Sequence, residues 1–358
     1  MKIFRKLFTL AIVAFLISLA TNCSSSETQI NASGEKADAT SSSQMEESTE
    51  AEESTEAEEP AEAEESTEAE EPAEAEESTE AEEAAVEAFP VTLQTAMGEL
   101  TLEAQPVKIL SLSPTATEIL FAIGAGEQVF AVDDQSNYPP EAPISDISGW
   151  SPNLEAILAM EPDLVVHSYL PEDIEQGLAN VGIPSLTQFS AMTLGDTYQQ
   201  IQQLGQATGN SEQAETVVSE MEQKIDDLVM RGSGFSPYTF YHELDQTYYS
   251  VTSTTFIGQV YAMIGLTNIA DAADEAGSGY PQLSEEYILS QDPDLIFLAD
   301  TKCCGQSAET VSERNGWGAL TAVNEGKVIE LDDDIASRWG PRVVDFFEAV
   351  VVAMEQVE

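Results

Sequence analysis

Two histidines, His167 and His242, carry the most distinctive chemistry in this sequence, because the chain contains no others. Each follows a short apolar run that predicts a β-strand, so we expect both imidazoles to emerge where strands end. Tyr169 and Tyr248 lie close behind them in the sequence. Imidazole and phenolate are axial ligands of haem, so one alternative is a haem or metal ion held by these side chains. The other alternative is a structural role for each histidine.

Cysteine is equally rare, with the adjacent pair Cys303 and Cys304 in the C-terminal part and Cys23 near the N-terminus. In an exported protein, the adjacent pair could form a disulfide, stay as thiols or contribute to a ligand site. The sequence leaves these three alternatives open.

Motifs for catalysis are absent from the sequence. It contains no GxGxxG, no GxxxxGK[ST] and no HExxH pattern. We therefore predict a binding protein that is not an enzyme and has no catalytic residues, no resident metal and no intrinsic cofactor.

An internal repeat predicts how such residues are positioned. Residues 155–167 (EAILAMEPDLVVH) match residues 286–298 (EYILSQDPDLIFL) at six of thirteen positions, with a constant offset of 131 residues. Each copy reads as a short helix, a turn at Pro162 or Pro293, and an apolar strand. Strands that alternate with helices predict parallel sheets, and a duplicated unit predicts two lobes of related topology.

A long amphipathic helix is predicted between the two copies, over residues 211–230. Twenty residues span about 30 Å, which is enough to connect two lobes. The predicted fold class is therefore α/β, with two Rossmann-like lobes built on central parallel sheets and joined by this single helix. A short hairpin is expected near residues 91–102, before the first lobe.

The N-terminus predicts export. Lys2, Arg5 and Lys6 precede an apolar run over residues 7–20, which has the length of a secretory signal and is too short to span a membrane. The run ends before Cys23, a pattern that resembles a bacterial lipoprotein signal, although Asn22 departs from it. We expect Cys23 to be acylated and to anchor the protein at the outer face of the cytoplasmic membrane.

Charge and composition exclude several classes of partner. Residues 46–83 repeat a Glu-rich unit of 12 residues without aromatic side chains, which is typical of a solvated tether. The formal net charge is -54, and residues 108–358 still contain 8 basic against 40 acidic residues. Nucleic acid is therefore excluded as a partner. The acidic surface is compatible with simple solubility or with a saline habitat, and we expect a monomer.

Six ordered motifs resemble the iron-siderophore and vitamin B12 substrate-binding proteins of ATP-driven importers, and the resemblance covers residues 89–358. They are Ile109–Gly124 (ILSLSPTATEILFAIG), Asn137–Pro140, Asn153–Glu155, Glu161–Leu164, Gly279–Ser284 and Gly340–Arg342. Proteins of this family hold their ligand in a cleft between two α/β lobes. The resemblance therefore implies the architecture that the repeat predicts.

The resemblance also implies which residues bind the ligand, because family members line the cleft with aromatic side chains. The matching positions are Tyr138, Trp150, Tyr280 and the pair Arg338–Trp339. Arg338 and Arg342 could meet an anionic group of the ligand or form ion pairs with nearby aspartates. The expected ligand-binding residues are Tyr138, Trp150, His167, Tyr169, His242, Tyr248, Tyr280, Arg338, Trp339 and Arg342.

Glu155 and Glu286 occupy equivalent positions in the repeat. In the resembled family, these positions carry glutamates that dock into arginine sites on the two transmembrane subunits of the importer. The alternative is that each carboxylate only favours the dipole of its helix N-terminus.

The expected function is that of an extracytoplasmic lipoprotein that delivers an iron-siderophore or cobalamin to an ABC permease. The two ligands are equal alternatives, and haem is a less favoured third. The alternative functions are a haem-binding protein of a haem importer and a surface lipoprotein without a role in transport. The expected division of the chain is a signal peptide at 1–22, a tether at 23–88, an N-terminal lobe at 89–192, a connector at 193–234 and a C-terminal lobe at 235–358.

Overall fold

The structure, a computed structural model, describes residues 89–357. The predicted signal peptide, Cys23 and the Glu-rich segment lie outside these residues. Within the described part of the chain, no helix has both the length and the hydrophobicity to cross a membrane.

A hairpin precedes the first lobe, as predicted. Strands β1 (Val91–Thr95) and β2 (Gly98–Leu102) pair antiparallel, and Gly98 closes the turn with a φ of 120°. Leu93 and Leu102 are buried and join the main hydrophobic core.

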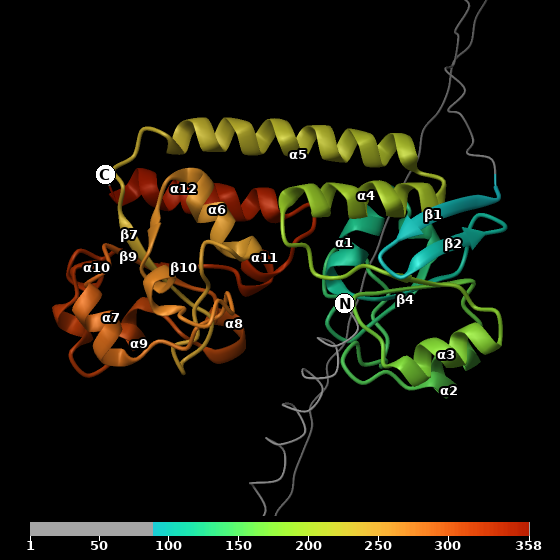
Figure 1. Ribbon diagram of the computed structural model, residues 1–358, viewed down its shortest axis with the longest axis horizontal. Coiled ribbons are helices and arrows are strands. Elements are labelled where there is room, and N and C mark those ends of the chain that lie inside the picture. The colour runs from blue at the N-terminus through green and yellow to red at the C-terminus, as the bar shows by residue number, and fades with distance from the viewer. Residues whose placement is uncertain (1–88, 358) are drawn as a thin grey trace, which may run out of the picture. The chain divides into compact units, whose positions relative to one another are not determined.

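The first lobe, called the N-lobe here, contains a parallel sheet in the order β4-β3-β5-β6. Helices cover both faces of the sheet, with α1 and α4 on one face and α2 and α3 on the other (Figure 1). The elements are β3 (Ile109–Leu112), α1 (Pro114–Ala122), η1 (Gly126–Gln128), β4 (Val129–Val132), α2 (Leu154–Met160), β5 (Leu164–His167), α3 (Glu172–Asn180), β6 (Ser185–Thr187) and α4 (Leu194–Thr208).

The second lobe, called the C-lobe, contains a parallel sheet in the order β10-β9-β7-β8. Its strands are β7 (Thr239–Glu243), β8 (Thr267–Asn268), β9 (Leu295–Leu298) and β10 (Val328–Glu330). Its helices are α6 (Phe256–Ile264), η2 (Ile269–Ala273), α7 (Glu285–Gln291), α8 (Thr301–Cys304), α9 (Ala308–Ser312), η3 (Trp317–Ala319), α10 (Thr321–Asn324), α11 (Asp333–Ser337) and α12 (Val343–Val357).

The two sheets have the same topology, which confirms the two related lobes that the repeat predicts. Counted along the chain within each lobe, the second strand lies at one edge, followed by the first, third and fourth. In both copies the residue before the turn proline, Glu161 or Asp292, is left-handed and ends the helix. Two residues later, Asp163 accepts hydrogen bonds from the backbone of Lys108, and Asp294 accepts the equivalent bond from Thr239. The repeated residues therefore have the same structural role in both lobes: they end a helix and bind the backbone at the start of the first strand.

Helix α5 (Ser211–Gly232) connects the lobes, in agreement with the predicted helix at 211–230 (Figure 1). Its apolar face packs on α4 at one end and on α12 at the other. The buried positions are Ala214, Val218, Met221, Ile225, Leu228 and Gly232, which follow the helical period. One hydrophobic cluster therefore runs from the N-lobe through α5 into the C-lobe.

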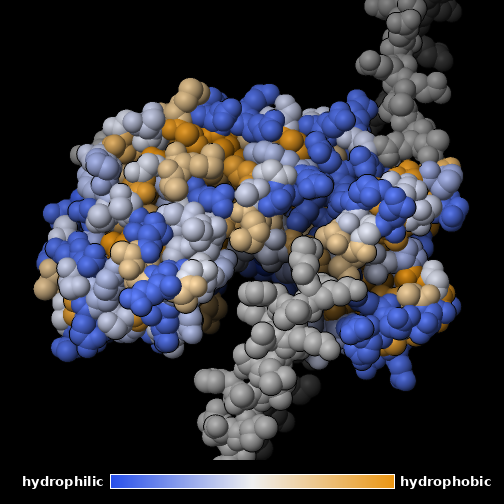
Figure 2. All heavy atoms as spheres, in the orientation of Figure 1, coloured by the Kyte–Doolittle hydropathy of each residue, from blue (hydrophilic) through white to orange (hydrophobic). Residues whose placement is uncertain are grey.

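The acidic residues lie mostly at the surface. Hydrophilic side chains cover most of the visible face in Figure 2, and hydrophobic ones occur there in small groups. Among the buried residues, charged groups are few and include Glu118, Asp133, Glu243 and Asp300. A buried charge needs a partner or a function, so these four carboxylates are candidates for a role in the site.

Candidate functional site

A cavity of about 690 Å³ lies between the N-lobe and the C-lobe. Its N-lobe wall is made by the segments that follow all four strands of that sheet, together with Gly149 and Trp150. Its C-lobe wall is made by Asp334 and Ser337 of α11 and by the two residues after that helix, Arg338 and Trp339. Ligands of open α/β sheets bind at the carboxyl ends of strands, where loops and helix N-termini converge. The cavity therefore has the position expected of a ligand site.

The start of α1 contributes a polar edge to this cavity. Ser113 caps the helix by accepting from the backbone N–H of Ala116, and Pro114 is the first helical residue, as the sequence predicts. The Ser113 hydroxyl also lies 2.7 Å from that of Ser168, in the loop after β5. Both residues line the cavity.

Aromatic side chains form much of the cavity wall. Trp150 is 86% exposed, Tyr169 is 67% exposed and Phe189 is 45% exposed, and all three line the cavity from the N-lobe. Trp339 faces them from the C-lobe and donates through Nε1 to Oε1 of Gln200, at 3.1 Å. Exposed aromatic rings that converge on one hollow supply large contact area for a flat or apolar ligand.

Phe189 is absent from the residues that the sequence predicts. Phe189 is the second residue after strand β6, whereas Ser113 and Ser168 directly follow β3 and β5. A prediction of β6 would be needed to place Phe189 at the cavity. The run of residues 185–187 is too short, and its polar and apolar residues too mixed, to predict a strand from the sequence. Phe189 is therefore not predicted.

Arg338 and Arg342 share a single buried carboxylate. Nη1 of Arg338 donates to Oε1 of Glu118 at 2.8 Å, and Arg342 donates to both oxygens of Glu118 at 3.0 and 2.6 Å. The Glu118 side chain is 1% exposed, whereas those of the two arginines are 11% and 14% exposed. Glu118 belongs to α1 and both arginines belong to the C-lobe, so these contacts join the two lobes beside the cavity.

Arg338 makes further contacts within the same junction. It pairs with Asp334 at 2.8 Å, one of the neighbouring aspartates that the sequence suggested, and it donates to the backbone oxygen of Gln135. Asp334 also accepts from the amide of Asn137 in the N-lobe, at 3.2 Å. Arg338 lines the cavity with its charge already neutralised.

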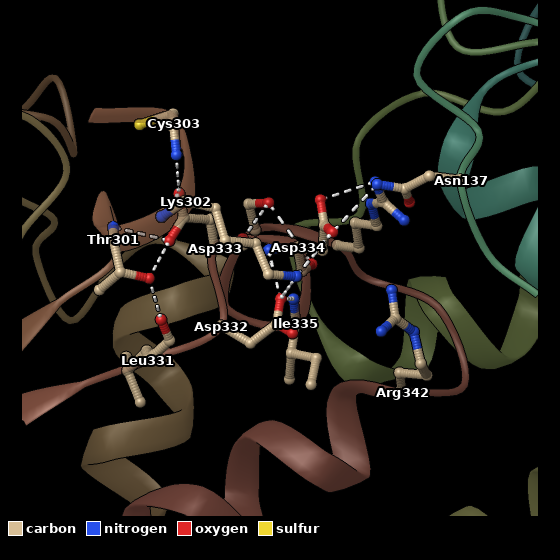
Figure 3. Close-up of polar contacts among 12 residues, drawn as sticks. Asn137, Thr301, Lys302, Cys303, Leu331, Asp332, Asp333, Asp334, Ile335 and Arg342 are labelled. Carbon is tan, nitrogen blue, oxygen red and sulfur yellow. Dashed lines mark hydrogen bonds and ion pairs between the residues drawn. The ribbon is translucent and has the colours of Figure 1, made fainter. Parts of the chain in front are cut away.

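Helix α8 holds the start of α11 in place (Figure 3). Asp333 accepts hydrogen bonds from the backbone N–H groups of Thr301, Lys302 and Cys303. The ammonium group of Lys302 pairs with Asp332 and Asp334. Cys303 and Cys304, at the end of α8, are joined by a disulfide in this structure, which is the first of the three alternatives that the sequence left open. The pair is exposed and does not line the cavity.

The two histidines do not lie at the cavity, in contrast to the expectation that they emerge there. Both belong to their strands and are fully buried. Alternation along β5 directs the His167 side chain toward α3, where its Nε2 lies 4.0 Å from Oε1 of Glu175. Nδ1 of His242 shares a hydrogen bond of 2.8 Å with the hydroxyl of Tyr261 on α6. Burial lowers the pKa of His167 to about 4 and that of His242 to about 3, so both are neutral near pH 7.

Four further predicted residues lie outside the cavity lining. Arg342 stacks over the ring of Tyr138 at 4.1 Å, on a separate hollow between α1, α5 and α12. Tyr248 stacks on Trp317 with a centroid distance of 5.7 Å. Tyr280 is 47% exposed on a C-lobe loop. Of the ten expected ligand residues, the structure thus brings four together at the cavity, namely Trp150, Tyr169, Arg338 and Trp339.

Metal binding finds no support in the arrangement of side chains. Among residues 89–357, no group of three or more histidines, cysteines, aspartates or glutamates is placed to hold a metal ion. His167 and His242 belong to different sheets, and neither Tyr169 nor Tyr248 contacts them through a hydrogen bond. These four side chains therefore do not form one haem or metal site in this structure.

Asp133 is a buried carboxylate in the cavity wall. It is 1% exposed, and its Oδ1 accepts from the backbone N–H of Gln135 at 2.8 Å. Its Oδ2 has no hydrogen-bond donor. Burial raises the pKa of Asp133. The carboxyl of Asp133 is therefore a buried polar group of the N-lobe wall, packed against Gly149.

Asp300 is a second buried carboxylate, in the C-lobe beside the ion pair of Glu243 and Arg314. Neither of its oxygens has a donor, and it is fully buried. Arg314 is committed to Glu243, with Nη1 at 2.6 Å from Oε2. Burial, reinforced by the charge of Glu243, raises the pKa of Asp300 to about 7.

This shift predicts how stability depends on pH. An unfolded aspartate has a pKa of about 4, so the folded state binds this proton more tightly and loses stability as pH rises from about 4 to about 7. Asp300→Asn removes the ionisation, and we expect it to raise the free energy of unfolding at pH 8 by up to about 4 kcal/mol, with little change at pH 4. Urea unfolding at the two pH values measures this. Asp227→Asn, at an exposed site, is the control. If Asp300→Asn raised the free energy of unfolding equally at both pH values, the raised pKa of Asp300 would be contradicted.

Glu155 and Glu286 have equivalent environments in the two lobes. Each is the second residue of its helix, α2 or α7, after an N-cap residue, Asn153 or Ser284. Both carboxylates are exposed, and neither makes a hydrogen bond or ion pair within the described part of the chain. They are therefore free to contact another molecule.

Known proteins resemble this chain in both sequence and structure. Residues 109–335 match the sequence profile of a family described as periplasmic binding protein. The uncharacterized ABC transporter substrate-binding lipoprotein YvrC of Bacillus subtilis is 30% identical over 274 residues, which cover 73% of this chain and 84% of that protein. A vitamin B12-binding protein of Pectobacterium carotovorum is 32% identical over 248 residues, covering 67% of this chain and 86% of that protein. The crystal structure of the periplasmic vitamin B12 binding protein of Vibrio cholerae is 26% identical, with a TM-score of 0.58 over 71% of this chain and 99% of that one.

Proposed function

The chain belongs to the periplasmic binding protein family, and on this premise we propose that it captures a corrinoid outside the cytoplasm and delivers it to an ABC permease. The observation that carries this proposal is the cavity between the lobes. It lies at the carboxyl ends of the N-lobe strands, Trp339 lines it from the C-lobe, and exposed aromatic rings line it from the N-lobe.

The charge of the cavity favours a neutral ligand. Among its lining residues Arg338 is the only cation, and Glu118 and Asp334 already neutralise it. The lining also contains the buried carboxyl of Asp133, which would disfavour a further negative charge nearby. Haem propionates and anionic ferric siderophores would meet no free cation here, and burying an unpaired anion is costly. A neutral corrinoid with hydrogen-bond donors at its rim fits better, and the relatives that are named vitamin B12-binding proteins support this choice.

An iron-siderophore remains the second candidate ligand, since a neutral hydroxamate chelate would also suit an aromatic cavity. The arginines would be expected to face the ligand if it were strongly anionic. They face Glu118 instead.

The absorption spectrum of the protein purified from its own cells tests the ligand. We expect corrin bands, and we expect cyanocobalamin added to the ligand-free protein to quench tryptophan fluorescence through Trp150 and Trp339. The Trp150→Ala variant should weaken binding by about tenfold or more. The ligand loses its stacking contact with an exposed ring, while the hydrophobic core is unchanged. A Soret band would identify haem, and binding of a ferric hydroxamate without binding of cyanocobalamin would identify a siderophore.

Delivery to the permease is proposed to depend on Glu155 and Glu286. Each lobe presents one exposed carboxylate at the same helix position, which suits a receptor made of two similar subunits. A glutamate–arginine pair can be bidentate and can therefore orient the bound protein.

Attachment to the membrane is proposed to occur through Cys23, which lies outside the described residues. A diacylated cysteine supplies two chains, which suffice for stable anchoring, and the Glu-rich segment up to residue 88 would then separate the lobes from the lipid surface. The division into a lobe up to residue 192, a connector up to residue 234 and a C-terminal lobe remains a proposal. The packing of α4 with the core of the N-lobe favours a connector that begins after α4.

A further inference from the structure

A second cavity, of about 440 Å³, adjoins the ligand cavity. The two cavities share Phe189 and Ser190 in their walls, so they are neighbours along the loop that follows β6. We call the second cavity the glutamine pocket, because its walls include Gln188, Gln199, Gln200 and Gln203.

The glutamine pocket is polar but contains no cation among its lining residues. Its single carboxylate, Asp196, is occupied by local contacts, because it accepts from the backbone N–H groups of Met192 and Thr193 and from the Thr193 hydroxyl. An anionic group would therefore find no counter-charge in this pocket, whereas an uncharged polar group would find both donors and acceptors.

Gln188 presents an acceptor that has no donor. Its side chain is 3% exposed, and its Nε2 donates to Oε1 of Gln203 at 2.8 Å. Nε2 of Gln203 in turn donates to the backbone oxygen of Gln94. This second bond sets the orientation of both amides, because Gln203 must turn its oxygen toward Gln188. Oε1 of Gln188 is therefore left buried and without a partner in the pocket wall.

The pocket is connected to the closure of the ligand cavity. Gln200 donates through Nε2 to the backbone oxygen of Phe189 and accepts from Nε1 of Trp339, which belongs to the C-lobe. Gln259, on α6 of the C-lobe, donates to the backbone oxygen of Met192, another lining residue. Contacts between the lobes therefore set the shape of the pocket.

We propose that the glutamine pocket binds a carboxamide arm of the ligand. The amide N–H of the arm donates to Oε1 of Gln188, and its oxygen accepts from Gln199, which is exposed and has no partner of its own within the described residues. Corrinoids carry carboxamides around the macrocycle, so this proposal rests on the proposed function. It adds that the protein selects a carboxamide over a carboxylate at one position of the ligand. A corrinoid in which this amide is a carboxylate places a negative charge against a buried acceptor, and is rejected.

The test compares cyanocobalamin with its monocarboxylate derivatives, in which single carboxamides are hydrolysed. For the native protein, we expect one positional isomer to bind at least about tenfold more weakly than cyanocobalamin near pH 7, and the others to bind similarly. In Gln199→Ala and Gln188→Met, cyanocobalamin should bind about tenfold more weakly, and the discrimination against that isomer should decrease. Gln213→Ala, which removes an exposed glutamine from α5, is the matched control.

The outcomes separate the two proposals. If the native protein binds cyanocobalamin and both pocket variants bind every derivative as the native protein does, the glutamine pocket is not a subsite, and the proposed function stands. If the native protein binds no corrinoid, both proposals are wrong. Because Gln188 is buried, its variant is compared only after its thermal unfolding matches that of the native protein, and Gln199→Ala tests the pocket without this requirement.

Discussion

Reversing Glu155 and Glu286 to lysine is expected to abolish uptake and to leave ligand binding unchanged. Both carboxylates are exposed at helix starts and neither lines the cavity, so the substitutions leave the lining of the ligand site unchanged. Two complementary pairs with the permease become two like-charge contacts, and transport should fall by at least about a hundredfold. Uptake of labelled ligand into cells or proteoliposomes that contain the cognate permease measures this, and fluorescence titration measures the affinity.

The control for this experiment changes the same amount of charge elsewhere. Glu215→Lys with Asp227→Lys places two new cations on α5, which lies away from α2 and α7 in Figure 1. This variant should transport normally. Transport by the Glu155/Glu286 double variant at the native rate would show that the two glutamates only favour their helix dipoles, an effect of about 0.3–1 kcal/mol each.

Truncating Glu118 to alanine is expected to lower the free energy of unfolding by about 3 kcal/mol. The side chain is buried, and its removal leaves the guanidinium groups of Arg338 and Arg342 partly buried without their shared carboxylate. Because these contacts join α1 to the C-lobe beside the cavity, the variant should also bind ligand more weakly. Urea unfolding followed by circular dichroism gives the stability, and titration gives the affinity.

An exposed ion pair supplies the comparison for Glu118. Arg231 and Glu355 lie 2.8 Å apart with side chains about half exposed, so Glu355→Ala should cost no more than about 0.5 kcal/mol. Glu118→Gln, which keeps one acceptor oxygen, should lie between the two. Equal losses in Glu118→Ala and Glu355→Ala would mean that the buried junction contributes nothing beyond a surface ion pair.

Glu118 also shows why a site cannot be read from sequence neighbours alone. Before the structure, Arg338 and Arg342 had two candidate partners, the ligand or the aspartates next to them in the chain. One of those aspartates, Asp334, does pair with Arg338, but the main partner is Glu118, which lies 220 residues before Arg338. Only the packing of α1 against the C-lobe brings these groups together.

The histidines illustrate a different limit of the sequence. The apolar run before His167 predicts a strand, and the strand is present, but it includes the histidine as its last residue. Whether a polar residue at the end of such a run continues the strand or leaves it depends on pairing with neighbouring strands. His167 pairs with Leu112 and Thr187, so its side chain follows the alternation of the sheet and packs under α3.

The sequence by itself determined the features that depend on local patterns. The repeat predicted two lobes of equal topology, the apolar period predicted α5, and the serine–proline pair predicted the start of α1 at the cavity edge. These are decided by dihedral preferences and by hydrophobic periodicity, which neighbouring residues set among themselves. The tertiary structure alone decided which side chains converge. Phe189 lines the cavity with Trp150 and Tyr169, the arginines contact Glu118, and Oε1 of Gln188 has no partner. Each of these outcomes depends on contacts between segments that are distant in the chain.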